Sequence, residues 1–226
     1  MKLLALDTSS SVAGAAVLSD GKLISEEYRD HRRTHSEIIL PMAERVLSAV
    51  ELDVSDMDAF AVNIGPGSFT GVRIGVCAVN AMAAALNKPV VPVDALEALA
   101  YHAAFYGDTV CPLLDARGEQ IYGARFDVSG GVPRLLGERQ ATTIGECLET
   151  LTAAKPYFIG DGALAHRERI VELFPQAVFA PAQLMGARAS SVAALAQHKL
   201  ALGLSEKEAM PLYLRRPQAE RMRQNG

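Results

Sequence analysis

The chain has 226 residues, of which 50% are hydrophobic and 21% charged, with a formal net charge of −4. This is the composition of a soluble globular protein with a sizeable core, and the acidic balance gives no indication of general nucleic-acid binding. The three cysteines lie far apart without a Cys-x-x-Cys pair, which argues against a disulfide framework and predicts a cytoplasmic protein. We find no secretory signal and no run of eighteen apolar residues, so we expect no membrane span.

The first half of the chain predicts three strands followed by alternating helices and strands. A buried strand ends at Asp7, and Asp20-Gly21 is a hairpin signal between two further strand-like runs. Thr34 and Glu37 fit a capping box before an apolar-periodic helix, in which Pro41 predicts a kink or a later start. A strand, a glycine-rich loop, a helix, a strand and a helix then follow, at 58–64, 64–71, 70–87, 89–94 and 95–105.

The second half repeats this order. We expect three strands, a helix, a strand, a helix, a strand and a helix at 109–116, 120–128, 132–140, 143–154, 156–160, 163–174, 177–180 and 189–202. Such a duplicated α/β unit predicts two lobes, each a mixed sheet covered by helices. We place the lobes at residues 1–107 and 108–188, and expect the last helix, about 189–203, to pack back on the first lobe.

The sequence IGPGSFTGVRIG, residues 64–75, opens a helix and raises two alternatives. It is not a P-loop, because Gly71 is followed by Val72 and Arg73, and its glycine spacing misses the dinucleotide fingerprint by one residue. A helix N-terminus still attracts anions, whereas Ser68 and Thr70 would serve equally well as N-caps. Anion binding and simple capping both remain open from these residues.

The helix that follows, residues 70–87, carries a single charge, Arg73, and is apolar around several sides. Such a helix is usually buried all round, so it is covered either by its own lobe or by a second polypeptide. The preceding helix offers Ile39, Met42 and Val46 beside it. Together the two helices could form a self-complementary patch, which would favour a symmetric homodimer.

Candidate chemistry elsewhere is weaker. His31 and His35 have metal spacing, but the Thr34 cap would leave His31 outside the helix, so we expect no metal site. Asp7 and Asp115 end matching strands, where a two-lobed phosphotransfer protein would hold a metal–phosphate group. A second glycine-rich turn surrounds Asp161, which either faces a nucleotide or caps the next helix. The candidate degenerate nucleotide site, with weak binding at most, therefore consists of Asp7, Thr8, Ser9, Asp115, Gly160, Asp161 and Gly162.

Four segments, LLALDTSS, HSEIILP, GPGSFTGVRIG and PLYLR, together resemble the TsaB (YeaZ) family over almost the whole chain. The resemblance implies an α/β, two-lobed, duplicated actin-like ATPase fold of the sugar kinase, Hsp70 and RNase H-like kind. It also implies a non-catalytic relative of TsaD that needs no cofactor. TsaD transfers the threonylcarbamoyl group to the adenosine beside the anticodon of tRNAs that read ANN codons. Implied partners are TsaD, the ATPase TsaE, a second copy of the chain, and tRNA only through the complex.

Only some of the functional residues that the resemblance implies have counterparts in this chain. The His-x-x-x-His metal pair of TsaD would fall where this chain has His102 and, four residues later, Tyr106, so the second ligand is missing. The resemblance places the partner contact on the two helices described above, and we assign it to His35, Ile39, Met42, Val46, Gly71, Val72, Gly75, Ala78, Val79 and Met82. The alternative from another class is an active actin-fold ATPase or small-molecule kinase that uses Asp7 and Asp115.

Overall fold

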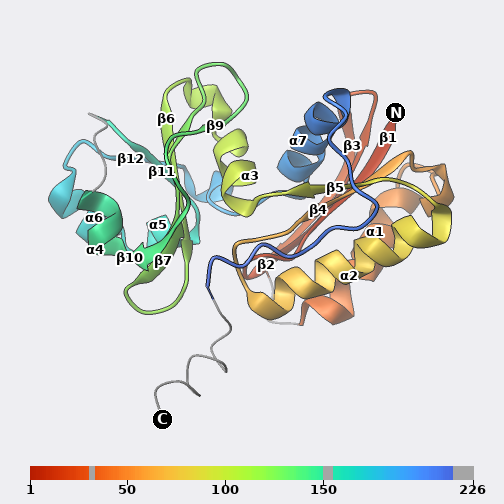
Figure 1. Cartoon of the computed structure of the whole chain (residues 1–226), viewed down its shortest axis with the longest axis horizontal. Helices are drawn as coiled ribbons and strands as arrows, with labels where there is room; N and C mark the ends of the chain where they lie inside the picture. Colours follow the sequence, from red (N-terminus) through yellow and green to blue (C-terminus); the bar gives the residue numbers. More distant parts are fainter. Residues whose placement is uncertain (31–33, 150–154, 216–226) are drawn as a thin grey trace, which may run out of the picture.

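The computed structural model describes residues 1–30, 34–149 and 155–215 and shows two mixed sheets side by side (Figure 1). The first sheet has the order β3-β2-β1-β4-β5, in which β1 is antiparallel to β2 and parallel to β4. Its strands are β1 (Lys2–Asp7), β2 (Val12–Ser19), β3 (Lys22–Asp30), β4 (Ala59–Asn63) and β5 (Val90–Val93). The predicted hairpin is confirmed, because Asp20 and Gly21 join β2 to β3 with positive φ angles of 49° and 81°.

The first sheet is covered on both faces, and alternate residues of β1 show how. Leu4 and Leu6 join a core with α1 (His35–Ser48) and α2 (Phe69–Leu86), whereas Leu3 and Ala5 join a core with α7 (Ala189–Ala201). This is the period-two pattern of a strand that is buried on both sides. We call this sheet with α1, α2 and α7 the first lobe.

The second sheet has the order β10-β7-β6-β11-β12, and β8 also pairs with β6 while β9 pairs with β8. Its strands are β6 (Thr109–Asp115), β7 (Gln120–Gly123), β8 (Phe126–Asp127), β9 (Arg134–Leu135), β10 (Gln140–Thr143), β11 (Tyr157–Ile159) and β12 (Val178–Phe179). One face packs on α3 (Ala95–His102), and the other on α4 (Ile144–Glu149), α5 (Asp161–Ala165) and α6 (Arg167–Leu173). Three short 3₁₀ turns, Val54–Asp56, Ala104–Tyr106 and Ala182–Leu184, complete the described elements. We call this sheet with α3 to α6 the second lobe.

Several local predictions need correction. The Thr34 side chain makes no capping hydrogen bond, and only its carbonyl accepts from Glu37 N. The helix nevertheless begins at His35 and continues through Pro41, so it does not start late. In the second half, the strand expected over 120–128 is interrupted between β7 and β8, the one expected over 132–140 is reduced to β9 at Arg134–Leu135, and the helix expected over 163–174 is divided at His166.

The apolar-run criterion missed α2, which is long and apolar enough to cross a membrane by length and composition alone. A core helix of a globular protein passes the same test. In the structure α2 contributes six buried residues to the first lobe, namely Gly71, Val72, Gly75, Val76, Val79 and Ala83. The apolar character of α2 therefore has an explanation in packing against the sheet.

His102 lies where α3 meets α7, and it gives the fold a pH dependence. Its Nδ1 lies 3.2 Å from Ser191 Oγ, and its buried Nε2 has no hydrogen-bond partner among the described residues. Burial, with the Arg188 charge as a smaller cause, lowers the pKa of His102 below its usual value. The neutral imidazole is thus the form that the folded chain favours.

We predict that the free energy of unfolding loses a His102 contribution as pH falls below about 6.5, because the unfolded chain then binds a proton that the folded chain resists. Urea titrations between about pH 7.5 and 5 should show a smaller acid-side loss in His102→Gln than in the wild type. The exposed His198, on α7, supplies the control variant His198→Gln, which should keep the wild-type slope. Equal slopes in all three proteins would contradict this prediction.

Candidate functional site

The turn between β1 and β2 is organised by Asp7, which is only 2% exposed. Its Oδ1 accepts hydrogen bonds from Ser9 N at 2.9 Å and Ser9 Oγ at 2.8 Å, and its Oδ2 accepts one from Asn63 Nδ2 at 2.8 Å. Burial raises the pKa of Asp7, and these hydrogen bonds oppose that rise. Because both oxygens serve internal donors, Asp7 is an anchor for the turn and does not present its carboxylate to a metal–phosphate group.

The glycine loop packs directly on this turn. A Cβ added to Gly67 would lie 2.1 Å from Ser9 O, one added to Gly71 would lie 2.2 Å from Thr8 O, and one added to Gly75 would lie 2.4 Å from Thr8 Oγ1. No side chain fits at these distances. Glycine at these positions lets the start of α2 approach the β1–β2 backbone within the same chain.

Hydrogen bonds fix this contact and occupy two backbone N–H groups at the start of α2. Ser68 N donates to Ser9 O at 2.7 Å, and Thr8 Oγ1 donates to Gly71 O at 2.8 Å. Ser68 is the N-cap of α2, and its Oγ accepts from Gly71 N at 3.2 Å, which confirms the prediction of a capping serine. Thr70, the other capping candidate, lies inside the helix. The N–H groups of Ser68 and Gly71 are therefore already bonded to the protein.

The second glycine turn behaves in a similar way in the second lobe. Asp161 Oδ1 accepts from Asp115 N at 2.9 Å, and Asp161 makes no capping bond, so the prediction that it caps α5 was wrong. Gly160 is the N-cap, with φ of 105°, and a Cβ there would lie 2.1 Å from Leu113 O. A Cβ on Gly162 would lie 2.8 Å from the carbonyl carbon of Leu114. This turn is thus shaped by its contact with β6.

The carboxylates of the candidate nucleotide site form two groups. Burial raises the pKa of Asp161, and the nearby Asp115 contributes in the same direction. Asp115 is exposed, and its Oδ1 accepts from Arg117 N at 2.8 Å. Asp7 with Thr8 and Ser9 is bonded within the first lobe, and Asp115 with residues 160–162 within the second. Asp115 is thus the exposed carboxylate of the candidate site, whereas Asp7 is buried and bonded within its own turn.

The histidines do not build a metal centre in the part of the chain that the structure describes, where no cluster of three or more His, Cys, Asp or Glu could hold an ion. His35 begins α1 and stands beside Gly71, since a Cβ on that glycine would lie 3.1 Å from His35 Nδ1. Its proximity also opposes the rise in the pKa of Asp7 that burial causes. The metal interpretation of His31 falls outside the described residues.

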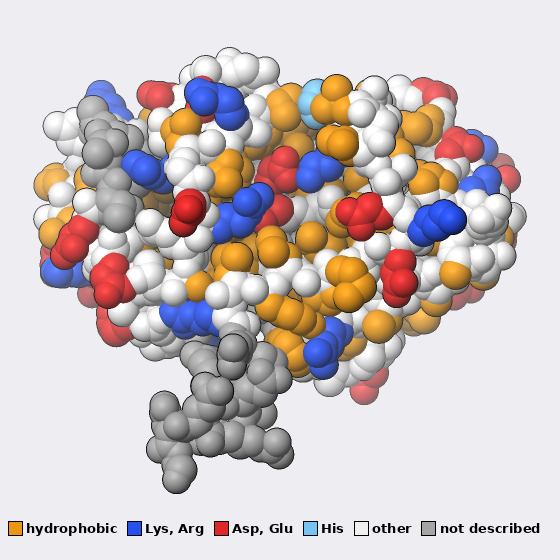
Figure 2. Space-filling view, viewed as in Figure 1, with side chains coloured by type: hydrophobic (Ala, Val, Ile, Leu, Met, Phe, Trp, Pro, Cys, Tyr) orange, Lys and Arg blue, Asp and Glu red, His pale blue; other side chains and the backbone are white. Residues whose placement is uncertain are grey.

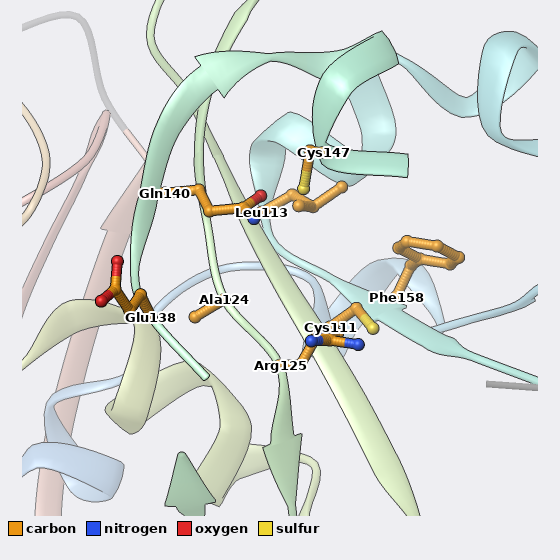
Figure 3. Close-up of a pocket in the computed structure, with 8 residues that line it drawn as sticks. All are labelled: Cys111, Leu113, Ala124, Arg125, Glu138, Gln140, Cys147 and Phe158. Atoms are coloured by element: carbon orange, nitrogen blue, oxygen red, sulfur yellow. The ribbon is translucent and has the colours of Figure 1, made fainter. Parts of the chain in front are cut away.

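A small cavity in the second lobe was not anticipated from the sequence. Figure 3 shows the side chains around it, which come mainly from β6, the β7–β8 connection, α4 and β11: Cys111, Leu113, Ala124, Arg125, Glu138, Gln140, Cys147 and Phe158. Burial raises the pKa of Cys111 and raises that of Cys147 to about 11. Both thiols are therefore protonated at neutral pH, which makes them poor metal ligands and weak nucleophiles.

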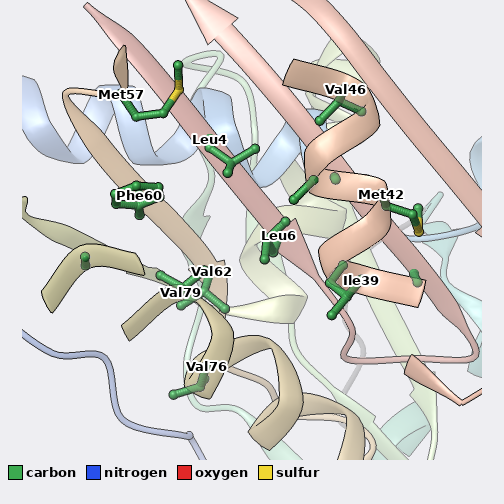
Figure 4. Packing of buried hydrophobic residues seen from close by; sticks show 14 of the residues in the cluster. Leu4, Leu6, Ile39, Met42, Val46, Met57, Phe60, Val62, Val76 and Val79 are labelled. Carbon is green, nitrogen blue, oxygen red and sulfur yellow. The ribbon is translucent and has the colours of Figure 1, made fainter. Parts of the chain in front are cut away.

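Most side chains of the partner surface predicted from the sequence are buried in the lone chain and cannot contact a partner there. Seven of its ten residues are buried inside the first lobe: Ile39, Met42, Val46, Gly71, Val72, Gly75 and Val79. Figure 4 shows side chains of both helices, among them Ile39 and Val79, gathered over Leu4 and Leu6 of β1. The physical reason is that α1 and α2 pack on the sheet through these faces. His35, Ala78 and Met82 remain half-buried.

The outward face of α2 is apolar and built of small residues. Its exposed positions are Thr70 and Arg73 in the first turns and then Cys77, Ala81, Ala84 and Ala85, bordered by half-buried Ile74, Ala78 and Met82. Beyond Arg73 this face carries no charge. Leu40 of α1 is 52% exposed, and Pro41 beside it is also exposed. Figure 2 shows hydrophobic side chains gathered along α2, with charged groups around them. We call this surface the α1–α2 outer face; sequence periodicity did not identify it because α2 is apolar on all sides.

The two-lobed arrangement of mixed sheets and helices is that of the actin-like ATPase fold. A ROK hexokinase from Thermus thermophilus has a similar fold, with a TM-score of 0.51 and 14% identity over 90% of this chain and 100% of the hexokinase. That similarity extends to the fold alone. The family model of TsaD, tRNA N6-adenosine threonylcarbamoyltransferase, matches residues 29–223 of this chain.

Two proteins are much more similar. The tRNA threonylcarbamoyladenosine biosynthesis protein TsaB of Bacillus subtilis is 30% identical over 223 residues, which cover 97% of this chain and 96% of that protein. YeaZ from Pseudomonas aeruginosa superimposes with a TM-score of 0.80 and 31% identity, covering 94% of this chain and 99% of YeaZ. The chain belongs to the TsaB (YeaZ) family, within the range of the TsaD family model, and its role is in tRNA threonylcarbamoyladenosine biosynthesis.

We predict that Gly75→Ala lowers the free energy of unfolding by about 1–3 kcal/mol, because its Cβ meets Thr8 Oγ1 and the helix must shift. Gly145→Ala is the matched control, since Gly145 is also helical but a Cβ there meets nothing within 4 Å. That change should be neutral or stabilising by about 0.5–1 kcal/mol. Urea unfolding of the two variants measures the difference, and an equal effect at both sites would refute the packing argument.

Proposed function

We propose that this chain is a non-catalytic subunit that binds the TsaD-type transferase through the α1–α2 outer face and holds it in a competent conformation. The transferase then forms threonylcarbamoyladenosine beside the anticodon of tRNAs reading ANN codons. The observation that carries the proposal is the part of the α2 outer face beyond Arg73, which carries no charge and exposes Cys77, Ala81, Ala84 and Ala85 in one stretch. Small side chains allow a partner helix to approach closely, and burial of the surface supplies the free energy of association.

The activating effect follows from linkage. A subunit that binds one conformation of the transferase more tightly than the others shifts the population toward that conformation. The chain's own polar groups are consistent with this role, because Asp7 and Asp161 bond to neighbouring backbone and side-chain groups. We accordingly propose that it works without a cofactor or metal of its own.

The same proposal covers the remaining partners. We expect TsaE to join the complex, and we expect the chain to contact tRNA only within that complex. When the transferase is absent, the outer face should pair with a second copy of this chain. A two-fold pairing of α1 and α2 with themselves would be isologous, as in most homodimers. We place the protein in the cytoplasm, with no membrane partner.

We predict that Ala81→Lys weakens binding of the TsaD-type transferase at least about tenfold, because the contact would bury an unpaired charge. Thermal unfolding of the lone chain should be unchanged, since Ala81 is exposed. Ala201→Lys, an equally exposed alanine on α7, is the control and should bind as the wild type does. Calorimetry with the purified transferase measures both, and a threonylcarbamoylation assay should fall in parallel.

Wild-type affinity of Ala81→Lys would disprove the assignment of the outer face. Absence of binding by the wild-type chain itself would disprove the proposed partner. These two outcomes are separate, because the first concerns only the surface and the second the function.

The alternative function, an ATPase or small-molecule kinase, predicts that Asp7→Asn abolishes turnover by the lone chain without loss of stability. The hydrogen bonds of Asp7 predict instead that the substitution lowers stability and that there is no turnover to lose. We expect Asp7→Asn to lower the free energy of unfolding by about 1–3 kcal/mol, because it replaces one acceptor oxygen by an NH₂ donor that faces the donors of Ser9 or Asn63. ATP hydrolysis should stay at background in both proteins. Measurable hydrolysis that disappears in the variant would favour the alternative.

A further inference from the structure

The segment that follows α7 has neither helix nor strand but is held by bonds along its length. We call residues 204–215 the C-terminal strap. It first meets the edge of the first sheet, where Val90 N donates to Glu206 O at 2.9 Å and Glu206 N donates to Val90 O at 2.8 Å. In Figure 1 the strap runs from there across the first lobe and ends in the lower part of the gap between the two sheets.

The middle of the strap is fixed to α2 and to the glycine loop. Asn80 of α2 makes two bonds with Ala209, donating from Nδ2 to its carbonyl at 3.0 Å and accepting from its N–H at 2.9 Å. Ala209 is fully buried. Leu212 N then donates to Ile64 O at 2.7 Å, at the point where the glycine loop begins. The strap therefore holds the same loop that packs on the β1–β2 turn.

The end of the strap connects the two lobes through arginine–aromatic contacts. Tyr213 packs on Phe69 with ring centroids 4.8 Å apart, and Arg73 donates to Tyr213 Oη at 2.8 Å while its guanidinium lies 3.9 Å from the Phe69 ring centroid. Two residues later, Arg215 hydrogen-bonds to Gln120 of β7, and its guanidinium lies 5.9 Å from the Tyr122 ring centroid.

We propose that the C-terminal strap is a latch that fixes the second lobe against the start of α2. The chain already crosses between the lobes between β5 and α3 and again before α7, and in Figure 1 α3 lies above the end of the strap. The strap adds a crossing on the side of the glycine loop. With the latch in place, the lobes keep one relative arrangement; when Arg215 releases β7, the second lobe moves independently of α2.

The latch also couples lobe arrangement to the α1–α2 outer face, a consequence that rests on the proposed function. Arg73, Asn80 and the outward residues belong to one helix, so the strap and the partner act on the same element. Free energy that orders α2 through the strap need not be supplied by the partner on binding. Release of the strap should therefore weaken the partner complex.

The test measures the distance between the lobes directly. Spin labels are attached to Ser48→Cys at the end of α1 and Glu168→Cys in α6, both exposed, in a full-length Cys77→Ser background that leaves only the buried Cys111 and Cys147. The labelled chain is diluted into an excess of unlabelled chain, so that distances between two copies do not contribute, and pulsed electron resonance should then give one narrow distance distribution. Arg215→Ala should broaden it, and Tyr213→Phe, which keeps the stacked ring but loses the hydroxyl, should broaden it less.

Arg134→Ala is the matched control, because Arg134 pairs with Asp127 inside the second lobe and should leave the distribution narrow. A distribution that stays unchanged in Arg215→Ala, or that is already broad in the unmutated background, would overturn the latch. In the unlabelled chain that keeps the native Cys77, we expect Arg215→Ala to lower affinity for the TsaD-type transferase about tenfold. Unchanged affinity would overturn the coupling, whereas a parent chain that does not bind at all would overturn the proposed function and leave the distance result standing.

Discussion

The rest of the structure depends on the approach of one helix backbone to one turn. The start of α2 lies so close to the β1–β2 turn that only glycine fits at residues 67, 71 and 75, and Thr8 and Ser9 bond directly to that loop and helix. Glycine inside a helix costs roughly 1 kcal/mol relative to alanine. Burial of Val72, Val76 and Val79 against the sheet offsets that cost. The contact also decides which side of α2 points outward.

A helix fixed in this way has two different apolar sides. The inner side, with its glycines, belongs to the first lobe, and the outer side is made of alanines, a cysteine and the edges of larger residues. A protein that acts alone has no need of an apolar outer side on this helix. In a subunit, the same helix can complete the core of its own chain and still offer a mainly apolar surface to another protein, which is the use we propose for it.

The order of elements was predictable because its signals are local. The Asp20-Gly21 hairpin, the serine cap of α2 and the repeated succession of strands and helices all depend on neighbours in the sequence. The outward face of α2 was not predictable, because a helix that is apolar all round carries no periodicity to orient it. Alanines at 81, 84 and 85 look like core residues until the positions that the glycines pack against are known.

The breaks in the second half and the strap escaped sequence analysis for a different reason. β7 and β8 are separate because they pair with different parts of β6, which is a property of the assembled sheet. The strap has no regular pattern, and its bonds reach α2, the glycine loop and β7 far away in the chain. Likewise, the aspartates at 7, 115 and 161 stand where a nucleotide site would have them, and only their hydrogen bonds show what they hold.

The exchange of helices between the two sheets has a consequence for synthesis of the chain. One face of the amino-terminal sheet is covered by α7, which spans residues 189–201, whereas α3 leaves that sheet to cover the next one. As the ribosome makes the protein, the five strands of this sheet therefore wait with an uncovered hydrophobic side until residues 189–201 have emerged. The strands that precede α7 by about a hundred residues acquire their native surroundings only after it is made, and chaperones have that interval in which to bind them.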